Sequence, residues 1–146
     1  MRFTIQKVIF LFCLTAISCK PKAEPIVYGS DSCHYCKMTI VSQQFASELV
    51  TQKGRVYKFD AVECMVQQLA DDSVKQNSLF LVHDYLSKTN NFIDAMTAYY
   101  VISEDIQSPM GAHLAGFKDL RQAEQFKEKH KGEIFTWKEL QAKINH

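Results

Sequence analysis

The chain has 146 residues, of which 47% are hydrophobic and 12% aromatic, and its formal net charge at pH 7 is +1. This composition is typical of a protein that buries one core, and it excludes a disordered or low-complexity chain. The near-neutral charge lacks the basic excess of a nucleic-acid-binding protein. We therefore expect one compact unit that does not bind nucleic acid.

The first 18 residues have the pattern of a secretory signal peptide. Arg2 and Lys7 supply a basic start, and residues 8–14 form a short apolar run. This run is too short to cross a membrane as a helix of the mature protein. We therefore expect residues 1–18 to be removed during export.

A potential lipid-attachment site follows at residues 16–19, Ala-Ile-Ser-Cys. This segment resembles a bacterial lipobox, in which a small residue precedes a cysteine that is acylated, for example with palmitate, and becomes the first mature residue. The resemblance implies a lipoprotein of the bacterial cell envelope, anchored to a membrane through Cys19 and facing the periplasm, with residues 19–30 as a polar tether. The alternative is ordinary cleavage, with Cys19 discarded or left free.

The other cysteines indicate metal binding or thiol chemistry. The sequence contains five cysteines, and removal of Cys13 with acylation of Cys19 would leave Cys33, Cys36 and Cys64. An odd number of cysteines in an exported protein argues against a framework of structural disulfides.

A β-hairpin is expected early in the chain. Residues 39–41 and 45–51 are rich in β-branched and aromatic side chains, and residues 53–54, Lys-Gly, form a plausible tight turn into residues 55–59.

A helix is predicted directly after this hairpin, over residues 61–72. Asp60 followed by Glu63 has the form of a capping box, and apolar residues then recur at helical spacing. Cys64 would lie in the first turn of this helix. A cysteine on an apolar helix face is more often a small buried hydrophobic residue than a ligand, so Cys64 is only a reserve ligand.

The second part of the chain alternates strands and helices. Strands are expected at residues 79–82, 92–94, 98–102 and 114–118. Asp119 with Gln122 predicts a capped helix that stops before Gly132.

An internal repeat is indicated by the last segment. Residues 132–137 match residues 54–59 in their turn glycine, branched residue and aromatics, and a capped helix follows each. Met38 precedes the first copy and Met110 precedes the second, so the repeat predicts that the two methionines occupy related positions. The cap of the second helix is Thr136 with Glu139. We predict an α+β fold with two related β-β-α halves, at about 31–95 and 96–146 of one domain over residues 31–146.

Sulfur and imidazole donors are concentrated in two short segments. Residues 33–38, Cys-His-Tyr-Cys-Lys-Met, carry three sulfurs and an imidazole, and residues 109–113, Pro-Met-Gly-Ala-His, carry a further thioether and imidazole. Thiolate, thioether and imidazole are the donors that select Cu(I) over harder ions. The predicted ligands of one Cu(I) site are Cys33, Cys36, Met38, Met110 and His113.

Three other interpretations of Cys33 and Cys36 remain open. A zinc site would need Cys64 and a histidine as further ligands. A thiol oxidoreductase would use the pair as a C-x-x-C motif, although such motifs normally precede a helix, whereas residues 37–41 look extended. The pair could also form a structural disulfide. The sequence shows no Ser-His-Asp arrangement and no phosphate-binding loop, so we do not expect an enzyme.

The combined motifs resemble the NosL family. They are the lipobox, D-x-C-x-x-C-x-M (Asp31 to Met38), F-D-x-x-x-C (Phe59, Asp60, Cys64) and Pro109-Met110-Gly111 followed by Ala115, Phe117, Ala123, Phe126 and Gly132. The resemblance implies a periplasmic Cu(I)-binding lipoprotein that supplies copper for the copper-sulfide centre of nitrous oxide reductase. It also implies contact with an ABC-transporter assembly complex, and an α+β fold related to the organomercurial lyase domain.

Overall fold

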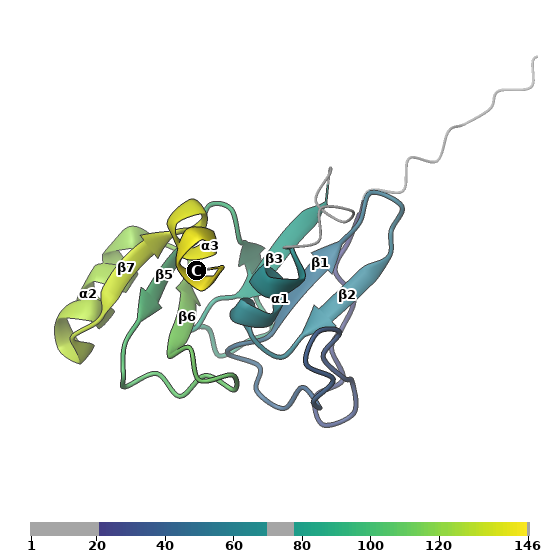
Figure 1. Cartoon of the computed structure of the whole chain (residues 1–146), viewed down its shortest axis with the longest axis horizontal. Coiled ribbons are helices and arrows are strands. Elements are labelled where there is room, and N and C mark those ends of the chain that lie inside the picture. Colours follow the sequence, from purple (N-terminus) through teal and green to yellow (C-terminus); the bar gives the residue numbers. More distant parts are fainter. Residues whose placement is uncertain (1–20, 70–77, 146) are drawn as a thin grey trace, which may run out of the picture.

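Two antiparallel sheets make up the fold of the computed structural model, which describes residues 21–69 and 78–145. The first sheet has the strand order β2-β1-β3-β4 and the second has the order β6-β5-β7. The strands are β1 (Ser47–Val50), β2 (Val56–Phe59), β3 (Leu79–His83), β4 (Phe92–Asp94), β5 (Tyr99–Ile102), β6 (Leu114–Phe117) and β7 (Glu133–Thr136). The helices are α1 (Val62–Gln68), α2 (Leu120–His130) and α3 (Trp137–Ile144). Figure 1 shows the sheets side by side, with α1 on the first, and α3 and α2 on the second. The predicted α+β class is confirmed.

The two sheets repeat one chain path. The path β1-β2-α1-β3 places its first strand between the other two, and β5-β6-α2-β7 does the same. This repeat supports two related halves. However, the sequence comparison aligned β7 with β2, whereas the order of elements along the chain matches β7 with β3. Both β2 and β7 are edge strands that lead into a helix, which explains their similar patterns. Met38 precedes β1 while Met110 lies between β5 and β6, so the topology does not make them equivalent.

Turn and capping residues account for most element boundaries. Gly54 adopts a φ of 81° in the turn between β1 and β2, a conformation that glycine favours. The side chain of Asp119 caps α2 by accepting a 3.0 Å hydrogen bond from the N–H of Gln122. The predicted capping box of Thr136 and Glu139 is present at the start of α3. These three predictions are confirmed.

The predicted cap of α1 is wrong. The helix begins after Ala61, and no side chain caps it. The carboxylate of Glu63 instead accepts a 2.9 Å hydrogen bond from the hydroxyl of Ser108, and Asp60 is buried before the helix begins. Both carboxyl groups are therefore used in tertiary packing. The predicted end of the helix at residue 72 lies outside the described residues.

Residues 39–41 were expected to form a strand, but only an isolated bridge is present there. Thr39 pairs with Ser32, and the N–H of Gly29 donates a 2.8 Å hydrogen bond to the carbonyl of Ile40. Residues 27–41 therefore fold back on themselves as a hairpin-like segment outside the main sheet. We call this segment the cysteine loop.

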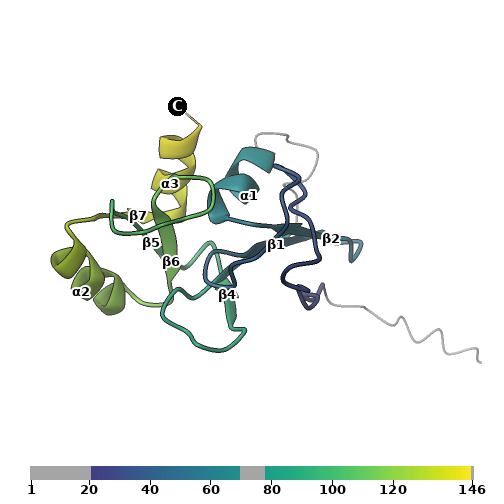
Figure 2. The ribbon, with the colours of Figure 1, turned by 90° about the horizontal axis from the view of Figure 1, so that it is seen from below.

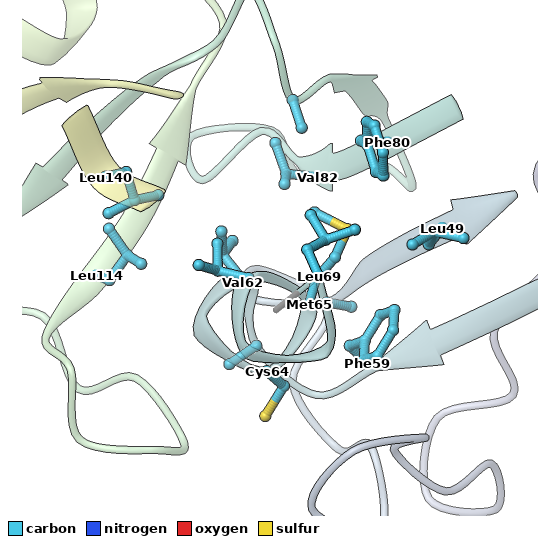
Figure 3. Packing of buried hydrophobic residues seen from close by; sticks show 14 of the residues in the cluster. Leu49, Phe59, Val62, Cys64, Met65, Leu69, Phe80, Val82, Leu114 and Leu140 are labelled. Carbon is cyan, nitrogen blue, oxygen red and sulfur yellow. The ribbon is translucent and has the colours of Figure 1, made fainter. Parts of the chain in front are cut away.

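The main core surrounds α1. Met65 and Val66 are fully buried on this helix, which packs against the first sheet and against α3. Figure 3 shows the apolar side chains of α1 facing Phe80 and Val82 of β3, whereas Cys64 lies on the opposite side of the helix. A second cluster surrounds Phe117 of β6, beneath α2. Cys64 therefore points out of the main sheet interface.

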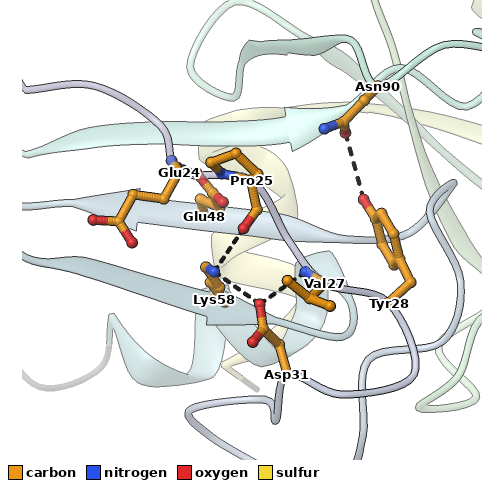
Figure 4. A network of polar contacts seen from close by, with 8 residues as sticks. All are labelled: Glu24, Pro25, Val27, Tyr28, Asp31, Glu48, Lys58 and Asn90. Carbon is orange, nitrogen blue, oxygen red and sulfur yellow. Dashed lines mark hydrogen bonds and ion pairs between the residues drawn. The ribbon is translucent and has the colours of Figure 1, made fainter.

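The segment before the cysteine loop is bound to the sheet. In Figure 2, α1 lies on one side of the first sheet and the start of the described chain, in purple, lies on the other. Lys58 of β2 donates 2.8 Å hydrogen bonds to the carbonyl of Pro25 and to the carboxylate of Asp31, as Figure 4 shows. The hydroxyl of Tyr28 donates to Asn90. The second half of the predicted tether therefore packs on the sheet.

The predicted signal peptide and Cys19 lie outside the described residues. Among the residues that are described, no helix is both long enough and apolar enough to cross a membrane.

A buried carboxyl group lies at the centre of the first sheet. Glu48 of β1 is fully buried, and it accepts a 3.2 Å hydrogen bond from the N–H of Glu24 through Oε2. Its Oε1 atom has no hydrogen-bond partner. Burial raises the pKa of Glu48 from 4.5 to about 7. The folded state therefore holds this proton more tightly than the unfolded state.

Replacement of Glu48 by Gln should change how stability depends on pH. Between pH 4.5 and about 7 the folded wild type binds more protons than the unfolded chain, so its stability falls as pH rises through this window. Glu48→Gln removes this contribution and should gain about 1–3 kcal/mol over the wild type between pH 4.5 and pH 8. Urea unfolding at several pH values measures the difference. A difference that is constant with pH would contradict the raised pKa.

Candidate metal centre

The segment Cys33 to Met38 forms a tight turn at the tip of the cysteine loop. The N–H of Cys33 donates a 2.8 Å hydrogen bond to the carbonyl of Met38, and the N–H of Lys37 donates a 3.1 Å bond to the carbonyl of Cys33. Lys37 adopts a φ of 65°, which closes the turn. The turn holds both cysteines of the C-x-x-C motif on a short, closed piece of backbone.

The turn is attached to β2. The N–H of His34 donates a 2.8 Å hydrogen bond to the carbonyl of Lys58. The centre of the His34 imidazole lies 4.5 Å from the centre of the Tyr57 ring, and the guanidinium of Arg55 lies 4.8 Å from the centre of the same ring. Because β2 leads directly into α1, this attachment also places the turn beside the start of the helix.

Three cysteine sulfurs meet at this junction. The Sγ atoms of Cys33, Cys36 and Cys64 all lie within 4.8 Å of one another, and all three cysteines are free thiols. Three sulfurs bound to one ion at about 2.3 Å lie about 4 Å apart, so the observed spacing is close to that of a three-coordinate metal site. A disulfide needs an S–S distance of about 2 Å, and none joins these three cysteines.

Access to the three sulfurs is uneven. Cys33 is 1% exposed and Cys64 is 0% exposed, whereas Cys36 is partly exposed. A metal ion held by all three sulfurs would therefore be shielded on the side of α1 and reached from the side of Cys36.

The environment favours one thiolate in the metal-free state. Hydrogen bonds from the thiol of Cys64 and from the N–H groups of Asp60 and Cys36 lower the pKa of Cys33 to about 4, against the opposing effect of burial. Donation of its hydrogen bond to Cys33, together with burial, raises the pKa of Cys64, and burial raises that of Cys36. A metal ion bound by all three sulfurs would displace the two remaining thiol protons.

Met38 lies at the edge of this cluster. Its side chain is 54% exposed, and its backbone carbonyl closes the turn. The residue lies two positions from Cys36 in the turn, and its participation as a ligand stays a prediction.

Met110 and His113 lie on the loop between β5 and β6, which contacts the start of α1. Met110 lines a pocket of about 360 Å³ together with Glu63 and Gln67 of α1, and no cysteine lines this pocket. Nδ1 of His113 lies 2.8 Å from the carbonyl of Ile106, so its imidazole is held within its own loop. His113 is not a member of the three-cysteine group. The predicted convergence of Met110 on the cysteines stays a prediction.

Cys64 is the residue that sequence reasoning underestimated. It was expected to be a small buried hydrophobic residue, and it is buried, but its sulfur joins the C-x-x-C pair. The hairpin of β1 and β2 brings the chain back beside the cysteine loop, and this places Cys64 next to Cys33 and Cys36. No local sequence pattern predicts this contact. The odd number of cysteines was the available signal.

Comparisons with known proteins agree on one family. The NosL family model matches residues 26–144. The copper-binding lipoprotein NosL of Stutzerimonas stutzeri is 28% identical to this chain over 94% of its length and 78% of the relative. The crystal structure of the copper chaperone NosL from Shewanella denitrificans is similar with a TM-score of 0.70 and 26% identity, covering 82% of this chain and 96% of that one. The chain therefore belongs to the NosL family.

Proposed function

We propose that this protein is a copper chaperone that binds one Cu(I) ion through Cys33, Cys36 and Cys64. The observation that carries the proposal is the cluster of three free cysteine sulfurs within 4.8 Å of one another. Thiolates select Cu(I) over harder ions, and the names of the two relatives add independent support for copper. Copper is the cargo of the protein, which we take not to be an enzyme.

The delivery target we propose is nitrous oxide reductase, whose copper-sulfide centre requires copper during assembly, with the ABC-transporter complex of that assembly as a further partner. A carrier must release its ion, and a site that is open on the side of Cys36 meets this need. Met38 is the proposed exchangeable ligand, because its thioether is exposed beside this opening.

Two other functions predict different results for the anaerobically purified protein. One Cu(I) per chain, retained against a moderate chelator, supports the chaperone. Stoichiometric zinc under the same conditions would indicate a zinc-stabilised module. Disulfide exchange with no retained metal would indicate a thiol oxidoreductase.

The proposed anchor is Cys19, and its replacement should release the protein. We expect Cys19→Ala to move the protein from the membrane to the periplasmic fraction, because a multiply acylated cysteine provides the hydrophobic contact that holds it there. Copper binding should be unchanged, since the three cysteines of the cluster are intact. Cys13→Ala in the predicted signal peptide is the matched control and should stay in the membrane. Recovery of Cys19→Ala in membranes at the wild-type level would rule out the anchor.

A further inference from the structure

Exposed apolar side chains are concentrated on the cysteine loop, and two of them, Tyr35 and Met38, lie in the turn that holds Cys36. Eight large hydrophobic side chains are exposed in the described part of the chain, and four of them belong to the cysteine loop. These four are Val27, Tyr35, Met38 and Val41. Exposed apolar side chains gathered around one site mark an interaction surface more often than an accident of folding.

Two cations lie at the same opening. Lys37 is exposed between Cys36 and Met38, and its Nζ donates a hydrogen bond to the carbonyl of His34. Arg55 is exposed and lies over the ring of Tyr57, against which His34 also packs. Both positive charges therefore flank the imidazole of His34, and neither is in an ion pair that the structure records among the described residues.

The acidic groups in this region do not neutralise these two cations. Asp31 is paired with Lys58 at 2.8 Å. Asp60 is buried, so its carboxyl group does not face the solvent beside these cations. The surface around Cys36 therefore combines exposed apolar side chains with two cations that no recorded ion pair neutralises among the described residues.

From this arrangement we propose that the surface formed by Tyr35, Lys37, Met38 and Arg55 docks a copper-accepting protein whose own copper site is bordered by acidic residues. This inference rests on the proposed copper function and names the chemistry of the partner. An acceptor ligand must approach through the opening beside Cys36, because Cys33 and Cys64 are buried. Opposite charges at that opening would orient the two sites and speed their encounter.

Exposed apolar side chains beside two cations would also suit an anionic membrane surface. The position of the three cysteines beside this surface favours a protein instead. A membrane lying on this surface would cover the side of Cys36, which is the exposed approach to the sulfurs. An acceptor that takes copper from this side needs the surface to be free.

Two synthetic peptides test the charge preference. Both carry the same Cys-x-x-Cys core, whose two thiolates compete for Cu(I), and three aspartates flank it in one peptide and three lysines in the other. Stopped-flow mixing with the copper-loaded protein measures the transfer rate. We expect the acidic peptide to accept copper about tenfold faster at low salt, with the difference lost at about 1 M salt.

Charge-reversal variants then locate the effect. The double variant Lys37→Glu, Arg55→Glu should abolish or reverse the preference when transfer is measured from equal amounts of copper-loaded protein. The matched control Lys118→Glu, Arg121→Glu changes exposed cations near α2, at the other end of the molecule in Figure 1, and should keep the preference. Tyr35→Ser should slow transfer to the acidic peptide, whereas Leu120→Ser, at a side chain of nearly equal exposure (41% against 42%), should not.

Three results would overturn the proposal. Equal transfer to both peptides at low salt would remove the charge preference, and an unchanged preference in the Lys37→Glu, Arg55→Glu variant would place it elsewhere. Binding of the Cys19→Ala protein to phosphatidylglycerol vesicles that depends on Lys37 and Arg55 would identify the surface as a membrane contact. Failure of the wild type to load copper would instead contradict the proposed function.

Discussion

A Cys64→Ser variant will bind Cu(I) at least about a hundredfold more weakly than the wild type, because it loses one of three sulfur ligands. Mutation of a residue that only supports a ligand already lowers metal affinity by up to about a hundredfold, so loss of a ligand itself should cost at least as much. Cys64 lies in the same cluster as Cys33 and Cys36, and its sulfur is within 4.8 Å of both. Competition with a colorimetric Cu(I) chelator under anaerobic conditions measures the affinity.

A matched control separates ligation from folding. Val66→Thr introduces a hydroxyl at another fully buried position of α1 and should lower stability by about 1–3 kcal/mol without affecting copper affinity in the folded protein. If Cys64→Ser resembles Val66→Thr in both stability and affinity, Cys64 is only a core residue.

Oxidation of the cysteine cluster should abolish copper binding. A mild thiol oxidant such as diamide removes two electrons and two protons from a pair of cysteines and forms one disulfide, which leaves only one thiol in the cluster. The bound copper should fall from one ion per chain to about a tenth of that or less, and treatment with dithiothreitol should restore it. Inductively coupled plasma analysis with thiol counting follows both quantities. Full copper binding by protein that has lost two free thiols would contradict ligation by this cluster.

The fold was largely predictable where local chemistry decides the structure. Runs of β-branched and aromatic residues predicted the β-hairpin and the strands β3 to β6, since such side chains suit a pleated, partly buried surface. Asp119 and Thr136 predicted the starts of α2 and α3, because a capping hydrogen bond forms within four residues of chain.

Tertiary contacts explain the predictions that were wrong. Glu63 has the right spacing for a capping box with Asp60, but the hydroxyl of Ser108 offers it a partner inside the protein. Residues 39–41 have the composition of a strand, but they pair within the cysteine loop. In the first case a partner distant in sequence replaced the predicted cap, and in the second a hairpin-like turn replaced the predicted strand.

The candidate site shows the same division. The C-x-x-C motif identifies Cys33 and Cys36 from spacing alone, whereas Cys64 joins them only because β1 and β2 fold back beside the loop. The repeat predicted from residues 54–59 and 132–137 aligned two edge strands and thereby paired Met38 with Met110. Sheet order gives a different alignment, and the side chain of Met110 lines a pocket with Glu63.

X-ray absorption spectroscopy at the copper edge tests the central claim most directly, because it counts the sulfur ligands of the bound ion. The anaerobically loaded wild type should show three sulfurs at about 2.3 Å, or four if Met38 also binds, and Cys64→Ser should lose one. A wild-type spectrum dominated by nitrogen or oxygen ligands, or one with a sulfur count that Cys64→Ser leaves unchanged, would contradict a copper site built on Cys33, Cys36 and Cys64.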